Sequence, residues 1–112
     1  MQLKTIRVRV DADLYELSLE KEVNVRTREN HMCTVCGKDT RNFAVRYSFR
    51  LKTDKTVGMA IYADTDHRDE LEFLMAKFQG LIPDEIAAQD DVWTSINQIL
   101  VKSGIKFRNI EP

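Results

Sequence analysis

A strict alternation of apolar and polar residues over 43–51 is the strongest constraint that this sequence places on its fold. The apolar side chains that occupy every second position are Phe43, Val45, Tyr47, Phe49 and Leu51. Successive side chains of a strand point to opposite faces, so this period of two predicts a strand with one buried face. A polar segment at 53–56 and a second alternation at Val57, Met59 and Ile61 predict a hairpin.

The same period of two is present upstream. Apolar residues alternate with arginines over 6–10, and a second run over 15–25 keeps one apolar parity except at Lys21. The interruption at Lys21 predicts either one long strand with a bulge or two short strands. A helix over 13–22 is the competing interpretation, but the alternation favours a strand.

The second half of the chain changes to helical spacing. Asp66 is a suitable helix N-cap, apolar residues recur every three or four positions over 71–78, and Gly80 is a suitable stop. Residues 83–85, Pro-Asp-Glu, are typical of the first turn of a short helix. These patterns predict two helices between 66 and the end of the 80s.

A third helix is expected to open at Asp90-Asp91, to bury Trp93 with Ile96 and Leu100, and to end before Gly104. Residues 105–110 alternate again and predict a last strand. The sequence therefore predicts an α+β fold, in which an antiparallel sheet of four to five strands carries two to three helices on one face. The helices are expected mainly in the C-terminal half.

Length and composition are those of one globular domain covering residues 1–112. A chain of 112 residues can bury a modest core without cross-links, and 43% hydrophobic with 31% charged residues argues against disorder. No apolar run reaches membrane-spanning length, and the first residues contain no apolar signal-peptide segment. We therefore expect a cytoplasmic protein with no membrane partner, in which cysteines stay reduced or bind metal.

Both cysteines lie in one turn, Cys33-Thr34-Val35-Cys36-Gly37-Lys38, and His31 stands two residues upstream. Two thiolates at this spacing can chelate one ion, while Gly37 lets the backbone turn beneath the sulfur atoms. These six residues resemble one knuckle of a zinc ribbon. The second cysteine pair of such proteins is missing here, so the resemblance assigns no family.

The expected hairpin supplies further ligands for this turn. Antiparallel pairing places Ala63 roughly opposite Arg46, so that residues 64–67 run towards the cysteines. The predicted zinc ligands are Cys33, Cys36, His67 and His31. Three alternatives remain open: an aspartate, a water or a second protomer in place of His31; a four-thiolate site shared across a dimer axis; and a reduced, metal-free pair.

Catalysis has weaker support in the sequence. A thiol redox enzyme needs its first cysteine at a helix N-terminus, whereas strands flank this turn and Gly37 opposes a helix start. The carboxylates over 64–70 are explained by a helix N-terminus. No phosphate-binding glycine loop, nucleophile elbow or catalytic triad motif is present. The sequence therefore predicts no catalytic and no organic-cofactor residues, with a small metalloenzyme or a thiol redox protein as the less favoured alternative.

Charge is unevenly distributed along the chain. Residues 1–62 carry 12 Lys and Arg against 8 Asp and Glu, whereas residues 63–112 carry 5 against 10. Arginines at expected solvent-facing strand positions could form a basic sheet face for nucleic acid; they are Arg7, Arg9, Arg26, Arg28, Arg46 and Arg50. The competing interpretation is a solvated face on which Glu16, Glu20 and Glu22 pair with these arginines.

From these patterns we expect a small non-enzymatic regulatory module, with a zinc ion at the cysteine turn, that binds a protein partner as regulator or inhibitor. The alternative is a nucleic-acid-binding accessory protein that uses Arg46, Arg50, Arg7 and Arg9. Either a monomer or a homodimer is consistent with the sequence.

Overall fold

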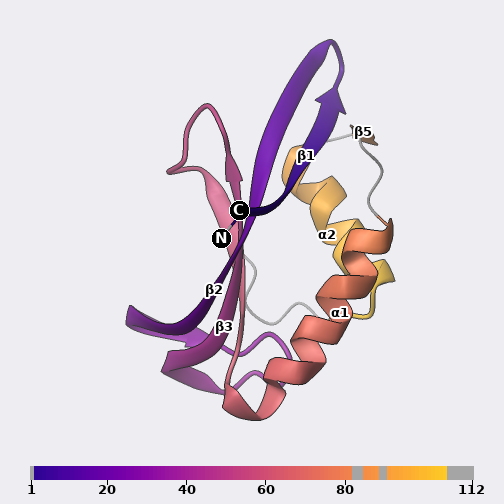
Figure 1. Ribbon diagram of the computed structural model, residues 1–112. Coiled ribbons are helices and arrows are strands. Elements are labelled where there is room, and N and C mark those ends of the chain that lie inside the picture. The colour runs from indigo at the N-terminus through magenta and orange to yellow at the C-terminus, as the bar shows by residue number, and fades with distance from the viewer. Residues whose placement is uncertain (1, 82–84, 89–90, 106–112) are drawn as a thin grey trace.

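A computed structural model describes residues 2–81, 85–88 and 91–105 of the chain (Figure 1). Its elements are β1 (Gln2–Val10), β2 (Asp13–Met32), β3 (Asp39–Leu51), β4 (Gly58–Ala63), the short 3-10 helix η1 (Thr65–His67), α1 (Arg68–Leu81), β5 (Glu85–Ala88) and α2 (Val92–Lys102). The α+β class expected from the sequence is confirmed, as is the placement of both described helices in the C-terminal half.

The sheet has the strand order β4-β3-β2-β1-β5. Strands β1 to β4 pair antiparallel in sequence order, but β5 pairs parallel to β1, with Val8 opposite Ile86. The sheet is therefore mixed, and the fully antiparallel prediction is wrong. The short helix predicted from Pro83 is wrong over 85–88, where pairing with β1 satisfies the backbone and buries Ile86; residues 83 and 84 lie outside the described residues.

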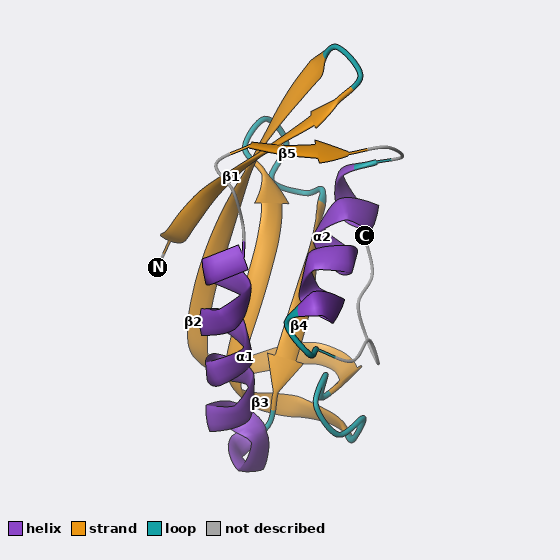
Figure 2. Ribbon diagram, turned by 90° about the vertical axis from the view of Figure 1, so that its right-hand side faces the viewer, coloured by secondary structure: helices purple, strands orange, loops and turns teal. Residues whose placement is uncertain are grey.

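Helices α1 and α2 cover one face of the sheet (Figure 2). The side chains that are fully buried between the two layers include Ile6, Val8, Leu17, Leu19, Phe49, Ile61, Leu71, Met75, Phe78, Ile96 and Leu100. The rings of Phe49 and Phe78 meet edge to face with their centroids 5.5 Å apart. The alternation over 43–51 and the helical stripe over 71–78 therefore predicted most of this main core, but Phe43 belongs to a separate cluster with Val25 and Tyr62. Trp93 packs against it, as expected.

Strand β2 is one continuous strand of 20 residues, so the competing helix over 13–22 is wrong. Lys21, which interrupts the apolar parity, lies opposite Tyr47 in the register and forms an ion pair with Glu72 of α1. Glu72 also accepts a hydrogen bond of 2.9 Å from Arg68. Lys21, on the helix-facing side of β2, is thus neutralised by the carboxylate of Glu72.

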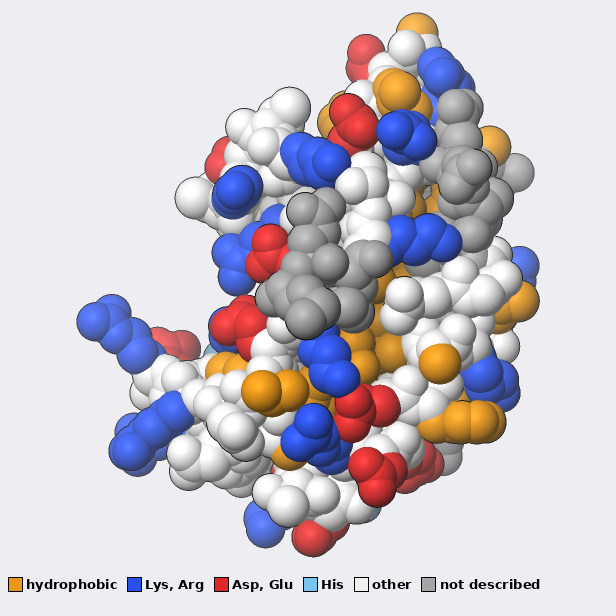
Figure 3. Space-filling view, in the orientation of Figure 1, with side chains coloured by type: hydrophobic (Ala, Val, Ile, Leu, Met, Phe, Trp, Pro, Cys, Tyr) orange, Lys and Arg blue, Asp and Glu red, His pale blue; other side chains and the backbone are white. Residues whose placement is uncertain are grey.

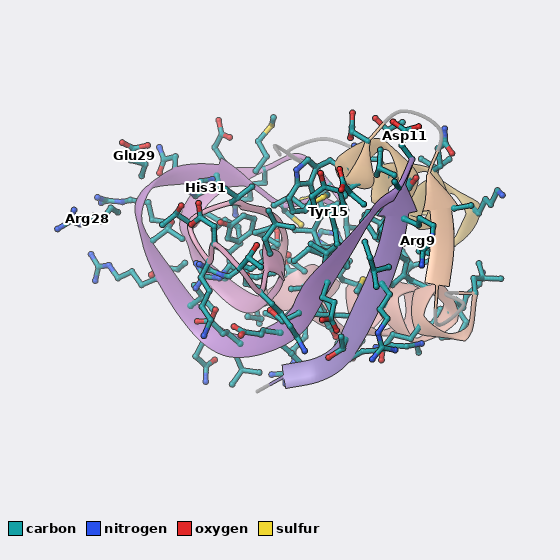
Figure 4. All side chains as sticks on the ribbon, turned by 90° about the horizontal axis from the view of Figure 1, so that it is seen from above. Arg9, Asp11, Tyr15, Arg28, Glu29 and His31 are labelled. Atoms are coloured by element: carbon teal, nitrogen blue, oxygen red, sulfur yellow. The ribbon has the colours of Figure 1, made fainter. Side chains whose placement is uncertain are left out.

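Asn24, within β2, has a left-handed backbone with a φ of 53°. Val23, expected in the core, is 49% exposed, while Val25 packs with Phe43 and Tyr62 in a second, separate apolar cluster. The β2–β3 register also shifts between Arg26 and His31. We call residues 25–32 and 39–43 the distal arm; seen from above, β2 bends into a wide curve there (Figure 4).

The helix ends follow the sequence signals with two changes. Asp64, and not Asp66, caps the helical segment that starts with η1, and α1 continues through Gly80 to Leu81. Asp91 caps α2 as expected, and Gly104 ends it with φ 96°. Ile105 is buried but not part of a strand, and the rest of the predicted last strand lies outside the described residues.

Neither of the two α-helices in the described part of the chain is long and apolar enough to cross a membrane.

Candidate metal centre

The cysteine turn is closed by its own backbone. Cys33 N–H donates to the Lys38 carbonyl at 2.9 Å, and Gly37 N–H donates to the Cys33 carbonyl at 2.8 Å. Gly37 has a φ of 81°, a conformation that side-chain-bearing residues rarely adopt. The turn therefore has the tight geometry that the Cys-x-x-Cys-Gly spacing predicted.

Thr34 attaches this turn to the edge strand β4. Its N–H donates to the Tyr62 carbonyl at 2.8 Å, and Tyr62 N–H donates to Thr34 Oγ1 at 3.1 Å. Both Thr34 and Cys33 are buried. Because the distal arm curves until the turn reaches the end of β4, the cysteines arrive next to the segment that follows Ala63.

The β3–β4 hairpin places this segment nearly as expected. Leu51 N–H donates to the Val57 carbonyl at 3.0 Å, and Ala63 lies opposite Val45, one residue from the predicted position. Residues 64–67 follow directly. The pairing register of β3 with β4 thus places Asp64 and His67 next to the cysteine turn.

Four potential ligands gather there: Cys33, Cys36, Asp64 and His67. Their ligand atoms all lie within 4.8 Å of one another. Cys33 Sγ is 4.0 Å from His67 Nδ1, and Cys36 Sγ is 3.4 Å from Asp64 Oδ2. Ligand atoms on a tetrahedral zinc ion stand roughly 3.3–3.8 Å apart, given the usual zinc–ligand bond lengths. The side chains therefore need only small movements to surround one ion.

Asp64 links the two segments. One of its carboxylate oxygens accepts the His67 N–H at 3.0 Å and lies 2.7 Å from His67 Nδ1, while the other accepts from Cys36. Burial raises the pKa of Asp64, but hydrogen bonds from His67 and Cys36 outweigh burial, so that this pKa lies below its ordinary value. The carboxylate is thus held charged at the centre of the cluster.

Cys36 is the exposed member of the pair and Cys33 the buried one. A backbone hydrogen bond from Lys38 lowers the pKa of Cys36, but desolvation and the neighbouring Cys33 and Asp64 outweigh it and raise the pKa. A cation bound here would offset the negative charge of the Asp64 carboxylate and of the cysteine thiolates that bind it.

His31, the fourth ligand expected from the sequence, is not among these four side chains. Its ring stacks on Tyr62 at a centroid distance of 4.8 Å and an interplanar angle of 15°. Asp64 is present in its place, which matches the aspartate alternative. The sequence signal for Asp64 was its position three residues before His67, where a helix N-cap and a metal ligand are both suitable roles.

The four arginines predicted for a nucleic-acid surface do not stand free on the sheet face. Arg7 pairs with Glu16 at 3.5 Å, and Arg46 pairs with Glu22 at 2.7 Å. Arg50 donates to the Lys55 carbonyl at 3.2 Å, and Arg9 also has an interaction partner. The pairing with Glu16 and Glu22 expected from the sequence is confirmed.

A pocket of about 80 Å³ lies beside the cysteine turn. It is lined by Thr34, Val35, Glu70, Leu71, Leu74, Gly104 and Ile105. Sites for small organic ligands usually enclose about 300–1,000 Å³, so this pocket is too small for one.

The arrangement can therefore hold a metal ion through two sulfur atoms, one nitrogen and one oxygen. Comparison with protein families, with curated proteins and with solved structures found no match to this chain.

Proposed function

We propose that this protein is a small non-enzymatic interaction module in which one zinc ion fastens the cysteine turn to the corner between β4 and α1, and that it acts by binding a protein partner as a regulator or inhibitor. The observation that carries the proposal is the cluster of Cys33, Cys36, Asp64 and His67, drawn from two segments of the chain.

Zinc is the ion that this donor set suits best. Thiolate, imidazole and carboxylate are its usual ligands, and four of them in a tetrahedron are typical of structural sites. Magnesium and calcium prefer sites made of oxygen atoms alone. Two cysteines among four donors therefore favour zinc over these cations.

Two features support a structural role over a catalytic one. Four protein ligands would fill the tetrahedron and leave no position for a substrate or a reactive water. Cys33 is fully buried and directly follows the last residue of β2, which does not suit a redox nucleophile. Both features give the metalloenzyme and thiol redox alternatives less support.

Partner binding is favoured because the metal would fix an otherwise weakly held surface. The cysteine turn is attached to the edge strand β4 through the hydrogen bonds of Thr34, and the ion would also join it to the corner between β4 and α1. A surface that is already rigid loses less conformational entropy on binding. We further propose that the protein acts in a reducing compartment such as the cytoplasm, where the thiols stay available to the ion.

The metal is tested by measuring zinc and molecular mass on protein purified without chelator. We expect one zinc per chain, lost in Cys33→Ser and in His67→Ala. His31→Ala is the matched control, because His31 lies nearby but stacks on Tyr62, and it should keep its zinc. Two free thiols without metal would contradict the proposal, as would half a zinc per chain in a dimer, which indicates a shared four-thiolate site.

Partner binding is tested by cross-linking tagged protein in the cells that produce it. A single stoichiometric protein partner should be recovered with the wild type and with His31→Ala, and lost with Cys33→Ser. Recovery that is equal for wild type and Cys33→Ser would contradict a role for the metal in binding. Absence of any stoichiometric protein with the zinc-loaded wild type would contradict the partner class.

A further inference from the structure

The distal arm holds those arginines of the described residues whose side chains make no ion pair or hydrogen bond. Among residues 2–81, 85–88 and 91–105, every arginine outside the arm has a hydrogen bond, an ion pair or another interaction partner. On the arm, Arg26, Arg28 and Arg41 are all exposed, and the side chain of none of them makes an ion pair or hydrogen bond within these described residues. This contrast separates the arm from the paired arginines of the sheet face.

The fold projects these side chains away from the body of the protein. The left-handed backbone at Asn24 and the register shift between Arg26 and His31 bend β2 and change the direction of its side chains. Arg28 points away from the molecule at the outside of the curve (Figure 4). In the space-filling view, Lys and Arg side chains extend at the lower left, where the arm lies (Figure 3).

The exposed surface of the arm is polar throughout. Its exposed side chains are Arg26, Arg28, Glu29, Asn30, Asp39, Arg41 and Asn42, and Lys38 of the cysteine turn adjoins them. Protein interfaces usually have an apolar centre, which the arm does not provide. Its aromatic side chains are not free to stack on bases either, because Phe43 is buried and His31 is stacked on Tyr62.

We propose that the distal arm binds the phosphodiester backbone of a double-stranded nucleic acid through Arg26, Arg28 and Arg41. A guanidinium group matches a phosphate with two parallel hydrogen bonds, and an unpaired one gives up no existing ion pair on binding. The arm is built from β2 and β3, paired on both sides of an irregular stretch between Arg26 and His31, and a ribbon of two strands fits the major groove of a duplex. This activity goes beyond the proposed function and uses none of the four metal ligands.

The affinity is expected to be modest and to depend on salt. Glu29 and Asp39 lie among the basic side chains, so few phosphates are neutralised. Three phosphate contacts give a logarithmic salt slope of about 2.7, so binding should weaken about 40-fold between 50 and 200 mM salt. At 50 mM salt we expect a dissociation constant on the order of 10 µM.

The experiment measures fluorescence anisotropy of a labelled 20-base-pair duplex titrated with the zinc-loaded full chain. Arg26→Gln, Arg28→Gln and Arg41→Gln together should abolish binding. The matched control combines Lys52→Gln, Lys55→Gln and Lys102→Gln, which removes the same charge from exposed positions elsewhere and should bind like the wild type. Arg28→Gln alone should lower the salt slope by about 1.

Four results would overturn the inference: no binding at 50 mM salt, equal loss in both triple variants, tighter binding to the single strand of the same sequence, or tighter binding to a poly-glutamate peptide. Tighter binding to poly-glutamate would indicate that the arm binds an acidic protein instead of a nucleic acid. Zinc content is measured on every variant. If the purified wild type contains no zinc but binds the duplex, the proposed function alone is contradicted. If the wild type contains zinc but does not bind the duplex, this inference alone is contradicted.

Discussion

The two ends of the sheet are held together in different ways. Where α1 and α2 cover the sheet, a continuous set of buried apolar side chains joins five strands to two helices. At the distal arm, the apolar contribution is the small cluster of Val25, Phe43 and Tyr62, to which the ring of His31 adds by stacking on Tyr62. One sequence thus contains a region stabilised by burial and a region stabilised by specific directional contacts.

This difference explains where a metal would be useful. The main core already buries enough apolar surface to fix its strands, so an ion there would add little. The cysteine turn lies instead at the far end of a long curved hairpin, attached to β4 through Thr34. A zinc ion bound by Cys33 and His67 would lock the curve at this point.

The comparison is tested most strongly by removing a large side chain from the main core. Phe49 is fully buried and packs edge to face on Phe78. Phe49→Ala should lower the free energy of unfolding by about 3–5 kcal/mol, with or without zinc. Val23→Ala, on the same sheet but half exposed, should cost less than about 0.5 kcal/mol. Denaturant unfolding measures both, and equal costs would contradict the claim that burial stabilises the main core.

Removal of the metal should have the next largest effect. An ion that binds only the folded state at a free concentration 100 times its dissociation constant stabilises by about 2.7 kcal/mol. Cys33→Ser should lose this increment, and added zinc should no longer raise its thermal midpoint. Zinc that stabilises Cys33→Ser as much as the wild type would show that the ion binds elsewhere.

The bend of the arm is tested at Asn24. A left-handed backbone costs a side-chain-bearing residue about 1–2 kcal/mol, and asparagine tolerates it better than a β-branched residue does. Asn24→Val should therefore lower the free energy of unfolding by about 1 kcal/mol, whereas Asn24→Gly should leave it nearly unchanged. If the valine and glycine variants unfold alike, the bend does not depend on the conformation at this residue.

The smallest expected effect concerns the polar link between β2 and α1. Hydrogen bonds from Lys21 and Arg68 hold the pKa of Glu72 below its ordinary value of 4.5. A lowered carboxyl pKa means that this stabilisation is complete above pH 4.5 and is lost as the pH falls through the lower, folded value. Glu72→Gln should cost about 0.5–1 kcal/mol at neutral pH and show a shallower loss of stability in acid. Parallel pH profiles would contradict this assignment.

The sequence predicted the regions whose patterns are local. Alternation over 43–51 identified β3 and its buried face, and Asp91 with Gly104 bounded α2, because caps and periodicity depend on neighbouring residues. Strand β5 could not be found in this way. Its four residues are a strand because β1 offers a free edge, and β1 lies almost eighty positions upstream.

The candidate site was predicted in part for a similar reason. The hairpin register runs through residues 45–63 and correctly carried His67 to the cysteines. His31 was misplaced, because β2 and β3 shift register before it and its ring turns to Tyr62. The parity prediction also failed at Val23, which is half exposed beside the left-handed backbone of Asn24, whereas Val25 is buried as expected but in the second cluster.

Hydrogen exchange with and without chelator tests the central claim, that a metal fastens the turn to the corner between β4 and α1. The amides to follow are those of Thr34 and Tyr62, which bond across the closure, and that of Phe49 in the main core. We predict that chelation removes most of the protection of the first two and leaves Phe49 unchanged. Protection that is unaffected at Thr34, or lost equally at Phe49, would contradict the account.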